Sequence, residues 1–209
     1  MRNVCAIFLL ATLLLLGSCA QIYYHPDAKT KASKHQIVAI IPPKVSIAAK
    51  KKVDAEALVE QQRTDSYTFQ QELYSWLLRR KAQNRIKVDL LDVETTNAKL
   101  KRAGYFDENP LTPSEAAALL GVDAVITSNF ALARPMSELA AVAVGVLVGV
   151  WGPTRSTVVS LEIHDRTSQQ MLWNYNHEIS GSVGSTHAGL VNHLMRGASK
   201  RMPYEQRMH

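Results

Sequence analysis

The residue whose type and position best suit chemistry is Cys19. It follows an apolar run, Ala6 to Leu16, and two small residues, Gly17 and Ser18. A thiol is a nucleophile that can receive a lipid, and small residues before it give a peptidase access to the backbone. A basic residue, here Arg2, before a short apolar run and small residues is typical of a secretory signal. The run is shorter than the ~20 residues that a membrane helix needs. The pattern therefore predicts a secretory signal that ends near Ser18 and Cys19.

The order Leu16-Gly17-Ser18-Cys19 resembles the bacterial lipobox, in which the cysteine is diacylated and becomes the first residue of the mature protein. The resemblance implies a lipoprotein that carries fatty-acyl groups such as palmitate. In lipoproteins of this type an Asp after the cysteine commonly retains the protein at the inner membrane, and here Ala20 follows. The resemblance therefore implies the periplasmic face of the outer membrane. Two alternatives to a lipoprotein signal are an ordinary secretory signal in which the cysteine occurs by chance and an uncleaved membrane anchor.

Charge and cysteine content exclude several classes of function. The chain has two cysteines; Cys5 leaves with the signal and Cys19 is alkylated, so the mature chain has no free thiol. A cysteine nucleophile, a Cys-ligated metal and a disulfide scaffold are thereby excluded. The net charge of +6 falls by one with the loss of Arg2. The basic residues are too scattered to indicate nucleic acid, and we expect none as a partner.

The seven histidines are the other candidates for chemistry. His187 and His193 are six residues apart, which does not place them on one helical face. His164 and Asp165 are adjacent, so in a strand they point to opposite faces. No zinc-binding HExxH motif and no close cluster of histidine and acid is present in the sequence. The pattern indicates surface or hydrogen-bonded histidines and predicts no metal and no cofactor.

Several elements of an α/β domain are legible. Residues 37–41, 86–93 and 124–132 read as strands, and 156–180 as a hairpin with its connection at 165–169. Residues 54–81, 95–103 and 186–202 read as helices, as does 112–121, which begins with the capping box Thr112-Pro113-Ser114-Glu115 and ends at Gly121. Residues 19–35 read as a lipidated cysteine and flexible tether, 44–52 as a basic connection, and 204–209 as a tail. The prediction is an α/β (α+β) fold, a single periplasmic domain at 36–203 with a mixed sheet of four to five strands packed with helices.

Residues 139–151 form an uncharged apolar run, LAAVAVGVLVGVW. As a helix it would be about 20 Å long, too short to cross a ~30 Å hydrocarbon core. It reads as a buried core helix, as a protein-contact surface, or as a segment that dips into the membrane or joins the wall of a multi-subunit pore; a strand or hairpin is also open. The residues assigned to a possible partner or membrane contact are Leu139, Val142, Val144, Val146, Leu147, Val150 and Trp151.

Three stretches carry a family resemblance: VAIIPP, AAALLGVDAVITSNFAL and VVSLEIHDRTSQQMLWNYN. In this order they resemble a group of bacterial envelope lipoproteins that includes CsgG, the amino-terminal domain of TolB, LpoB and the GNA-type lipoproteins. The whole chain also resembles an outer-membrane lipoprotein family that carries PPKVSIAAKKKVDAEAL and VGVWG. The motifs are short and structural, so the resemblance implies an α/β sandwich and no particular chemistry.

We therefore expect a non-enzymatic, lipid-anchored adaptor for cell-envelope assembly or maintenance. It would bind an envelope protein or a second copy of itself through anchors such as Trp151 or Tyr105 and Phe106. The alternative is a subunit of an oligomeric outer-membrane secretion or pore complex of CsgG-like type. An envelope hydrolase would need a convergent catalytic set, which the sequence does not display; His164 and His177 are the residues whose substitution would test it.

Overall fold

The chain folds around one mixed β-sheet with helices on both faces. The computed structural model describes residues 20–48, 54–105, 111–132, 156–180 and 186–206. The seven described strands have the order β1-β7-β6-β5-β2-β4, and β3 lies beside the second half of β5. The strands are β1 (Gln21–Tyr24), β2 (Ile37–Ile40), β3 (Lys44–Ile47), β4 (Asp89–Leu90), β5 (Ala124–Leu132), β6 (Ser156–Asp165) and β7 (Met171–Ser180). The predicted fold class is confirmed, with more strands than the four to five expected.

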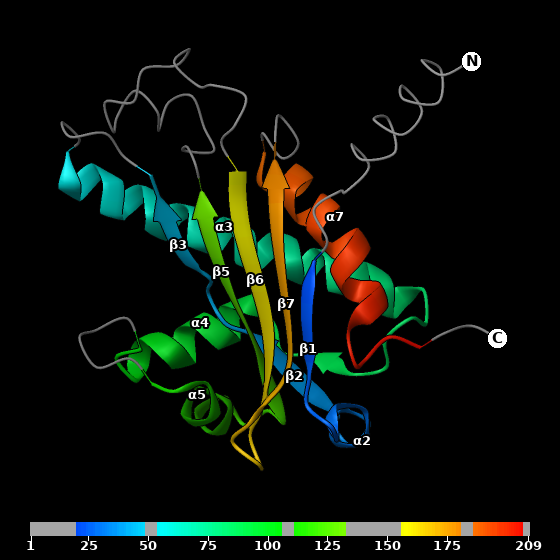
Figure 1. Cartoon of the computed structure of the whole chain (residues 1–209). Helices are drawn as coiled ribbons and strands as arrows, with labels where there is room; N and C mark the ends of the chain where they lie inside the picture. Colours follow the sequence, from blue (N-terminus) through cyan, green and yellow to red (C-terminus); the bar gives the residue numbers. More distant parts are fainter. Residues whose placement is uncertain (1–19, 49–53, 106–110, 133–155, 181–185, 207–209) are drawn as a thin grey trace, which may run out of the picture.

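The helices form two unequal layers (Figure 1). The described helices are α2 (Ala28–Ala32), α3 (Ala55–Ala82), α4 (Val93–Arg102), α5 (Pro113–Leu120), α7 (His187–Ala198) and a 3₁₀ turn, η1 (Ser199–Arg201). On one face α3 and α7 pack over the large core, which includes Phe69, Leu73, Phe130, Trp173 and Leu194. On the other face α4 and α5 pack over β2, the start of β5 and part of β6, with a smaller core that includes Leu100, Ala117 and Val125. The rest of that second face has no described helix over it.

Local sequence signals explain where the helices begin and end. The Asp54 carboxylate accepts hydrogen bonds from the backbone N–H of Glu56 and Ala57 and begins α3. The predicted capping box is present at α5, where the Thr112 side chain accepts from the Glu115 N–H and the Glu115 carboxylate accepts from the Thr112 N–H. Gly121 then adopts φ 73°, the left-handed conformation that ends many helices. The predicted start of α3 and both predicted ends of α5 are therefore confirmed.

A broken strand lies beside β5. Pro42 and Pro43 end β2, as predicted, but the chain resumes as β3 and pairs with the same side of β5. The register shifts by one residue across the break, because Val38 pairs with Ala124 whereas Lys44 pairs with Asn129. The prediction that 44–52 is a basic connection was wrong for Lys44–Ile47, since an exposed lysine and serine alternate there with Val45 and Ile47.

Helix α3 donates hydrogen bonds to two carbonyl groups at the break. The Gln70 side chain donates to the carbonyl of Ile40 at 2.8 Å, and the Ser66 hydroxyl donates to the carbonyl of Pro43 at 2.6 Å. Ser66 and Gln70 are one helical turn apart, so both reach the same strand. Gln70 also exchanges two hydrogen bonds with the Asn97 amide on α4, each 2.9 Å long.

The segment predicted as a flexible tether is folded from Ala20 onward. Gln21–Tyr24 forms edge strand β1, antiparallel to β7, with Gln21 opposite Asn176. Ala20 and Ile22 pack against the large core, and α2 buries Ala28 and Ala32. The prediction of a flexible tether was wrong because the segment carries few apolar residues of its own. The strand with which it pairs, β7, lies near the far end of the chain.

Two further boundaries differ from prediction. Of the expected strand at 86–93, only Asp89–Leu90 pairs as β4, although Ile86 and Val88 are buried. Asp92 instead caps α4 by accepting from the Thr95 N–H. The expected tail is folded as far as residue 206, because Tyr204 is buried and Glu205 contacts Arg80 and Arg85.

Candidate binding face

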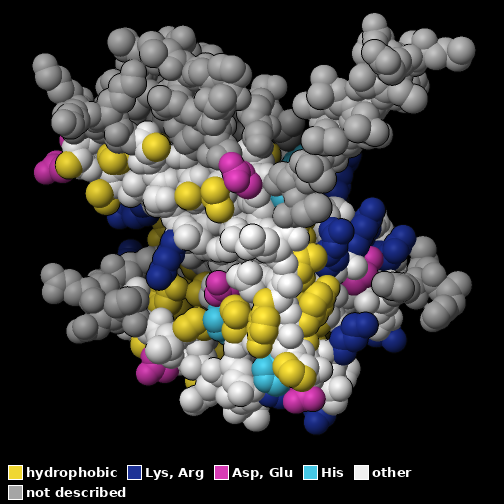
Figure 2. Space-filling model, viewed as in Figure 1, with side chains coloured by type: hydrophobic (Ala, Val, Ile, Leu, Met, Phe, Trp, Pro, Cys, Tyr) yellow, Lys and Arg dark blue, Asp and Glu magenta, His cyan; other side chains and the backbone are white. Residues whose placement is uncertain are grey.

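The uncovered face of the sheet is the broadest candidate surface among the described residues. It is formed by β5, β6, β7 and β1, whose opposite face packs on α3 and α7. Figure 2 looks onto this face, where few charged side chains lie over the middle of the sheet and lysine and arginine gather toward the side of α7. Tyr23 and Val158 are 46% and 40% exposed there.

Two rows of side chains cross this face from strand to strand. Thr127 lies opposite Glu162, Glu162 opposite Asn174, and Asn174 opposite Tyr23. The second row lies next to the first, two residues away along each strand, and consists of Asn129, Ser160, Asn176 and Gln21. Because side chains alternate between the two faces of a strand, both rows project to the same side.

The first row is organised around the Glu162 carboxylate. His164 Nε2 lies 2.8 Å from one carboxylate oxygen, which also accepts from the Thr127 hydroxyl at 3.3 Å, and Asn174 donates to the other oxygen at 3.2 Å. The hydrogen bond from His164 is the main cause that lowers the pKa of Glu162; partial burial opposes it, and the other two donors add to it. Glu162 is therefore a carboxylate at neutral pH with hydrogen bonds on both oxygens.

A pocket of about 420 Å³ opens beside this row, within the size range of small-molecule sites. Its floor includes Thr127, Asn129, Ser160 and Glu162, from β5 and β6. Its walls come from the broken strand and from the region of α5, with Pro42, Lys44, Tyr105, Leu111 and Pro113. The pocket therefore combines polar groups on the sheet with apolar and aromatic walls. Tyr105, an anchor expected from the sequence, lines it, whereas Phe106 lies outside the described residues.

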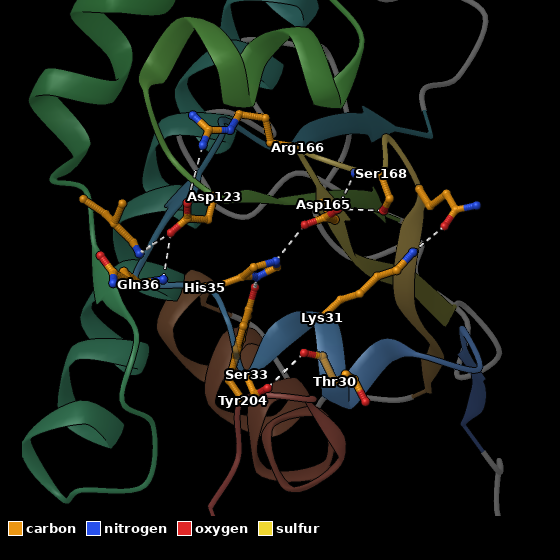
Figure 3. Close-up of polar contacts among 12 residues, drawn as sticks. Thr30, Lys31, Ser33, His35, Gln36, Asp123, Asp165, Arg166, Ser168 and Tyr204 are labelled. Atoms are coloured by element: carbon orange, nitrogen blue, oxygen red, sulfur yellow. Dashed lines mark hydrogen bonds and ion pairs between the residues drawn. The ribbon is translucent and has the colours of Figure 1, made fainter.

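A second histidine–carboxylate contact is buried and ties the chain together (Figure 3). His35 Nε2 lies 2.8 Å from Asp165, and His35 Nδ1 lies 2.7 Å from the Tyr204 hydroxyl. The other Asp165 oxygen accepts from the N–H and hydroxyl of Ser168, both at 2.6 Å. Burial favours protonation of Asp165, but these hydrogen bonds from Ser168 and His35 outweigh it and lower its pKa. Burial raises the pKa of Tyr204 far above its ordinary value. Since the side chains of His35 and Asp165 are 4% and 7% exposed, the contact is structural.

Asp123 makes a second set of contacts close to His35. Its carboxylate accepts from the backbone N–H groups of Gln36 and Ile37 at 2.7 and 3.0 Å, and Arg166 lies 3.6 Å away. Burial alone would raise its pKa, but the two backbone donors and the nearby His35 and Arg166 lower it. The start of β2 is thus tied to the end of the β6–β7 hairpin.

Of the remaining described histidines, His177 lies on β7 and His187 and His193 lie on α7, whereas His25 lies between β1 and α2. His187 Nε2 is 2.8 Å from the fully buried Asp65, which also accepts from Gln61 at 2.7 Å. The rings of His177 and His193 stack at 6.0 Å, and burial followed by the proximity of His193 lowers the pKa of His177. In the described part of the chain, no three histidine, cysteine or acidic side chains form a group that could hold a metal ion.

The structure brings together groups that the sequence keeps apart. His164 and Asp165 do point to opposite faces, as predicted. The contact of Glu162 with His164 was not predicted. The two residues are two positions apart on one strand, a spacing that places both side chains on the same face and would have indicated the contact. His35 and Asp165 are 130 positions apart, and no sequence signal links them. Ser18, Cys19 and the seven contact residues between Leu139 and Trp151 lie outside the described residues, so their roles stay predictions.

The comparisons with known proteins find similar solved structures of low sequence identity, among them a bacterial lipoprotein. No family model and no curated protein sequence matches the chain. Among solved structures, the lipoprotein GNA1162 from Neisseria meningitidis is 13% identical with a TM-score of 0.44, over 79% of this chain and 96% of that one. The LpoB C-terminal domain from Salmonella enterica is 9% identical with a TM-score of 0.33, over 69% and 82%. A PelC dodecamer from Paraburkholderia phytofirmans is 12% identical with a TM-score of 0.39, over 90% and 99%. At these values the likenesses carry no functional argument, and the resemblance to CsgG and TolB stays a prediction.

Proposed function

We propose that this chain is a lipid-anchored, non-enzymatic binding module for assembly or maintenance of the bacterial cell envelope, held at the periplasmic face of the outer membrane. One observation carries the proposal beyond the sequence. Ala20, next to the predicted lipid-bearing Cys19, packs against the core, and β1 begins at Gln21. A lipid on Cys19 is therefore joined almost directly to the folded sheet. None of the helices in the described residues is long and apolar enough to cross a membrane.

This short connection changes how the module works. A flexible tether would let the domain search a volume that grows with linker length. Without one, the domain lies against the membrane and in a restricted orientation, with the start of β1 toward the bilayer and α2 away from it (Figure 1). Its partner must therefore come close to the membrane. The open sheet face and its pocket are the surface that we assign to binding.

The distance of two labelled positions from the membrane tests this. Lipidated protein is placed in vesicles with headgroup-linked quenchers, and a fluorophore is attached through Gln21→Cys or Lys34→Cys, both at exposed positions. Quenching should be strong at position 21 and weak at position 34, which follows α2. Similar quenching at both would mean that a flexible tether permits all orientations. A Cys19→Ala variant that still partitions into membranes and still incorporates labelled palmitate would contradict the lipid anchor.

A second candidate is a subunit of an oligomeric outer-membrane secretion or pore complex. It is supported by topology: the apolar run 139–151 connects the end of β5 to the start of β6. Because β5 and β7 run antiparallel to β6 and β1, these ends lie at the same end of the sheet as the start of β1. The run and the lipid would then approach the membrane together. Light scattering of the Cys19→Ala protein separates the candidates, since a monomer without detergent favours the adaptor and a detergent-dependent assembly favours the subunit.

A further inference from the structure

The second row on the open face is built of neutral polar side chains without internal partners. Asn129, Ser160, Asn176 and Gln21 lie side by side on four neighbouring strands. Asn129 and Gln21 are exposed and the other two are partly exposed. None of the four side chains makes a hydrogen bond to another described residue, in contrast to the first row, where Glu162 engages three donors. The second row is thus free to bond to a ligand.

The chemistry of this row excludes several ligand classes. Three amides and a hydroxyl each offer donors and acceptors but no charge. The charged groups lining the pocket are Lys44 and Glu162, one of each sign, which does not favour an anion. Both Glu162 oxygens already accept hydrogen bonds, so a cation gains little there. An apolar ligand would leave the amides without partners.

We propose that the open face binds an uncharged, hydroxyl-rich chain, that is, an extended oligosaccharide, along Asn129, Ser160, Asn176 and Gln21. Each sugar hydroxyl can donate and accept, as each side chain of the row can. The apolar face of a terminal sugar ring would lie against Tyr105 and Pro42 in the pocket beside Asn129. The proposal concerns the sheet face alone and holds whether or not Cys19 carries a lipid.

Spacing favours a sugar chain over a peptide. Neighbouring strands are about 4.8 Å apart, so the row spans about 14 Å. The rings of a β-1,4-linked sugar chain repeat at close to this strand spacing. An extended peptide repeats its side-chain pattern every two residues, about 6.6 Å, and falls out of step with the row. A peptide also gains most by pairing with a sheet edge, not by crossing a face.

The test is direct binding of defined tetrasaccharides to the full-length lipidated protein in a detergent without a sugar headgroup. Cellotetraose and chitotetraose are the extended β-linked probes. Maltotetraose, whose α-links curve the chain, and an uncharged polar octapeptide are the comparison probes. Ligand-observed NMR and calorimetry should show saturable binding of at least one β-linked probe and weaker binding of the others. Absence of binding at 5 mM probe, on the order of the weakest affinity expected for such a site, overturns the proposal, as does preference for the peptide.

Matched variants locate the site. Asn129→Ala and Asn176→Ala should each weaken binding about fivefold, the effect of one lost hydrogen bond, and together about 25-fold. Asn192→Ala removes an exposed amide from α7, on the opposite side of the sheet, and should leave binding unchanged. All three positions are outside the buried core, so unchanged thermal unfolding checks that the fold is kept. Equal binding by the double variant and the parent would overturn the proposed row. Because none of these readouts involves the membrane, their failure leaves the lipid anchor to be judged separately.

Discussion

The imidazole of His35 lies 2.8 Å from the carboxylate of Asp165, and this contact joins the amino-terminal segment to the β6–β7 turn. Asp165 also orders that turn by accepting two hydrogen bonds from Ser168. On its other side His35 contacts Tyr204, near the end of the described chain. Three segments far apart in sequence therefore meet at one buried imidazole.

Replacing this imidazole should destabilise the fold markedly. His35→Ala leaves a buried carboxylate and a buried hydroxyl without their partner, which should cost about 3–5 kcal/mol in the free energy of unfolding. Tyr204→Phe removes only one hydroxyl and should cost about 1 kcal/mol. Urea unfolding followed by circular dichroism measures both. Equal, small effects would mean that water replaces His35 at no cost.

Stability should fall in acid because of Asp165. Its pKa is lower in the fold than in the unfolded chain, so its contribution is complete above the unfolded value of about 4 and is lost as the pH falls through the folded value. Asp165→Asn removes this titration and should flatten the acid limb between about pH 4 and pH 2. The free energy of unfolding, measured over this range, checks it.

Gln70 should matter more than its neighbour Ser66. Gln70→Ala leaves the Ile40 carbonyl and the Asn97 amide without the buried Gln70 amide, which should cost about 2–3 kcal/mol. Ser66→Ala removes one partly buried hydrogen bond to the Pro43 carbonyl and should cost about 1 kcal/mol. Chemical denaturation distinguishes the two. The reverse order would show that the break after β2 is held mainly at Pro43.

Gly197 should resist a substitution that normally favours helices. Alanine is about 1 kcal/mol better than glycine within a helix. A Cβ at position 197 would lie only 2.6 Å from the Tyr175 hydroxyl oxygen, on a ring that is almost fully buried. Gly197→Ala should therefore lower the melting temperature, and Tyr175→Phe, which removes that oxygen, should relieve most of the added cost. A double-mutant cycle with no coupling would contradict this contact.

The sequence predicted what is encoded locally. Helix α5 was placed by its capping box and Gly121, and β5 by its run of apolar and β-branched residues, because these signals act within a few positions. Strand β1 was missed because its partner, β7, lies some 150 residues away and its own exposed residues resemble a linker. Strand β3 was missed because Pro42 and Pro43 do end a strand locally, and only β5 supplies the edge on which the chain resumes.

In the candidate site, too, the local features could be predicted from the sequence and the long-range ones could not. Alternation along β6 places Ser160, Glu162 and His164 on one face, which the sequence shows. That Asn129 and Asn176 flank Ser160 depends on which strands are neighbours and on their register, which the hydrophobic pattern alone does not set. The row on the open face could therefore be found only once the strands were aligned.

The four-residue ladder of β1 with β7 also determines how the domain bears mechanical load. A pull on a lipid at Cys19 would reach the domain through Ala20 and act along the axis of β1. The hydrogen bonds between antiparallel strands are perpendicular to that axis, so the load shears them together instead of opening them one after another. With a lipid on Cys19, the same edge strand would both shorten the connection to a membrane and make that connection resistant to force.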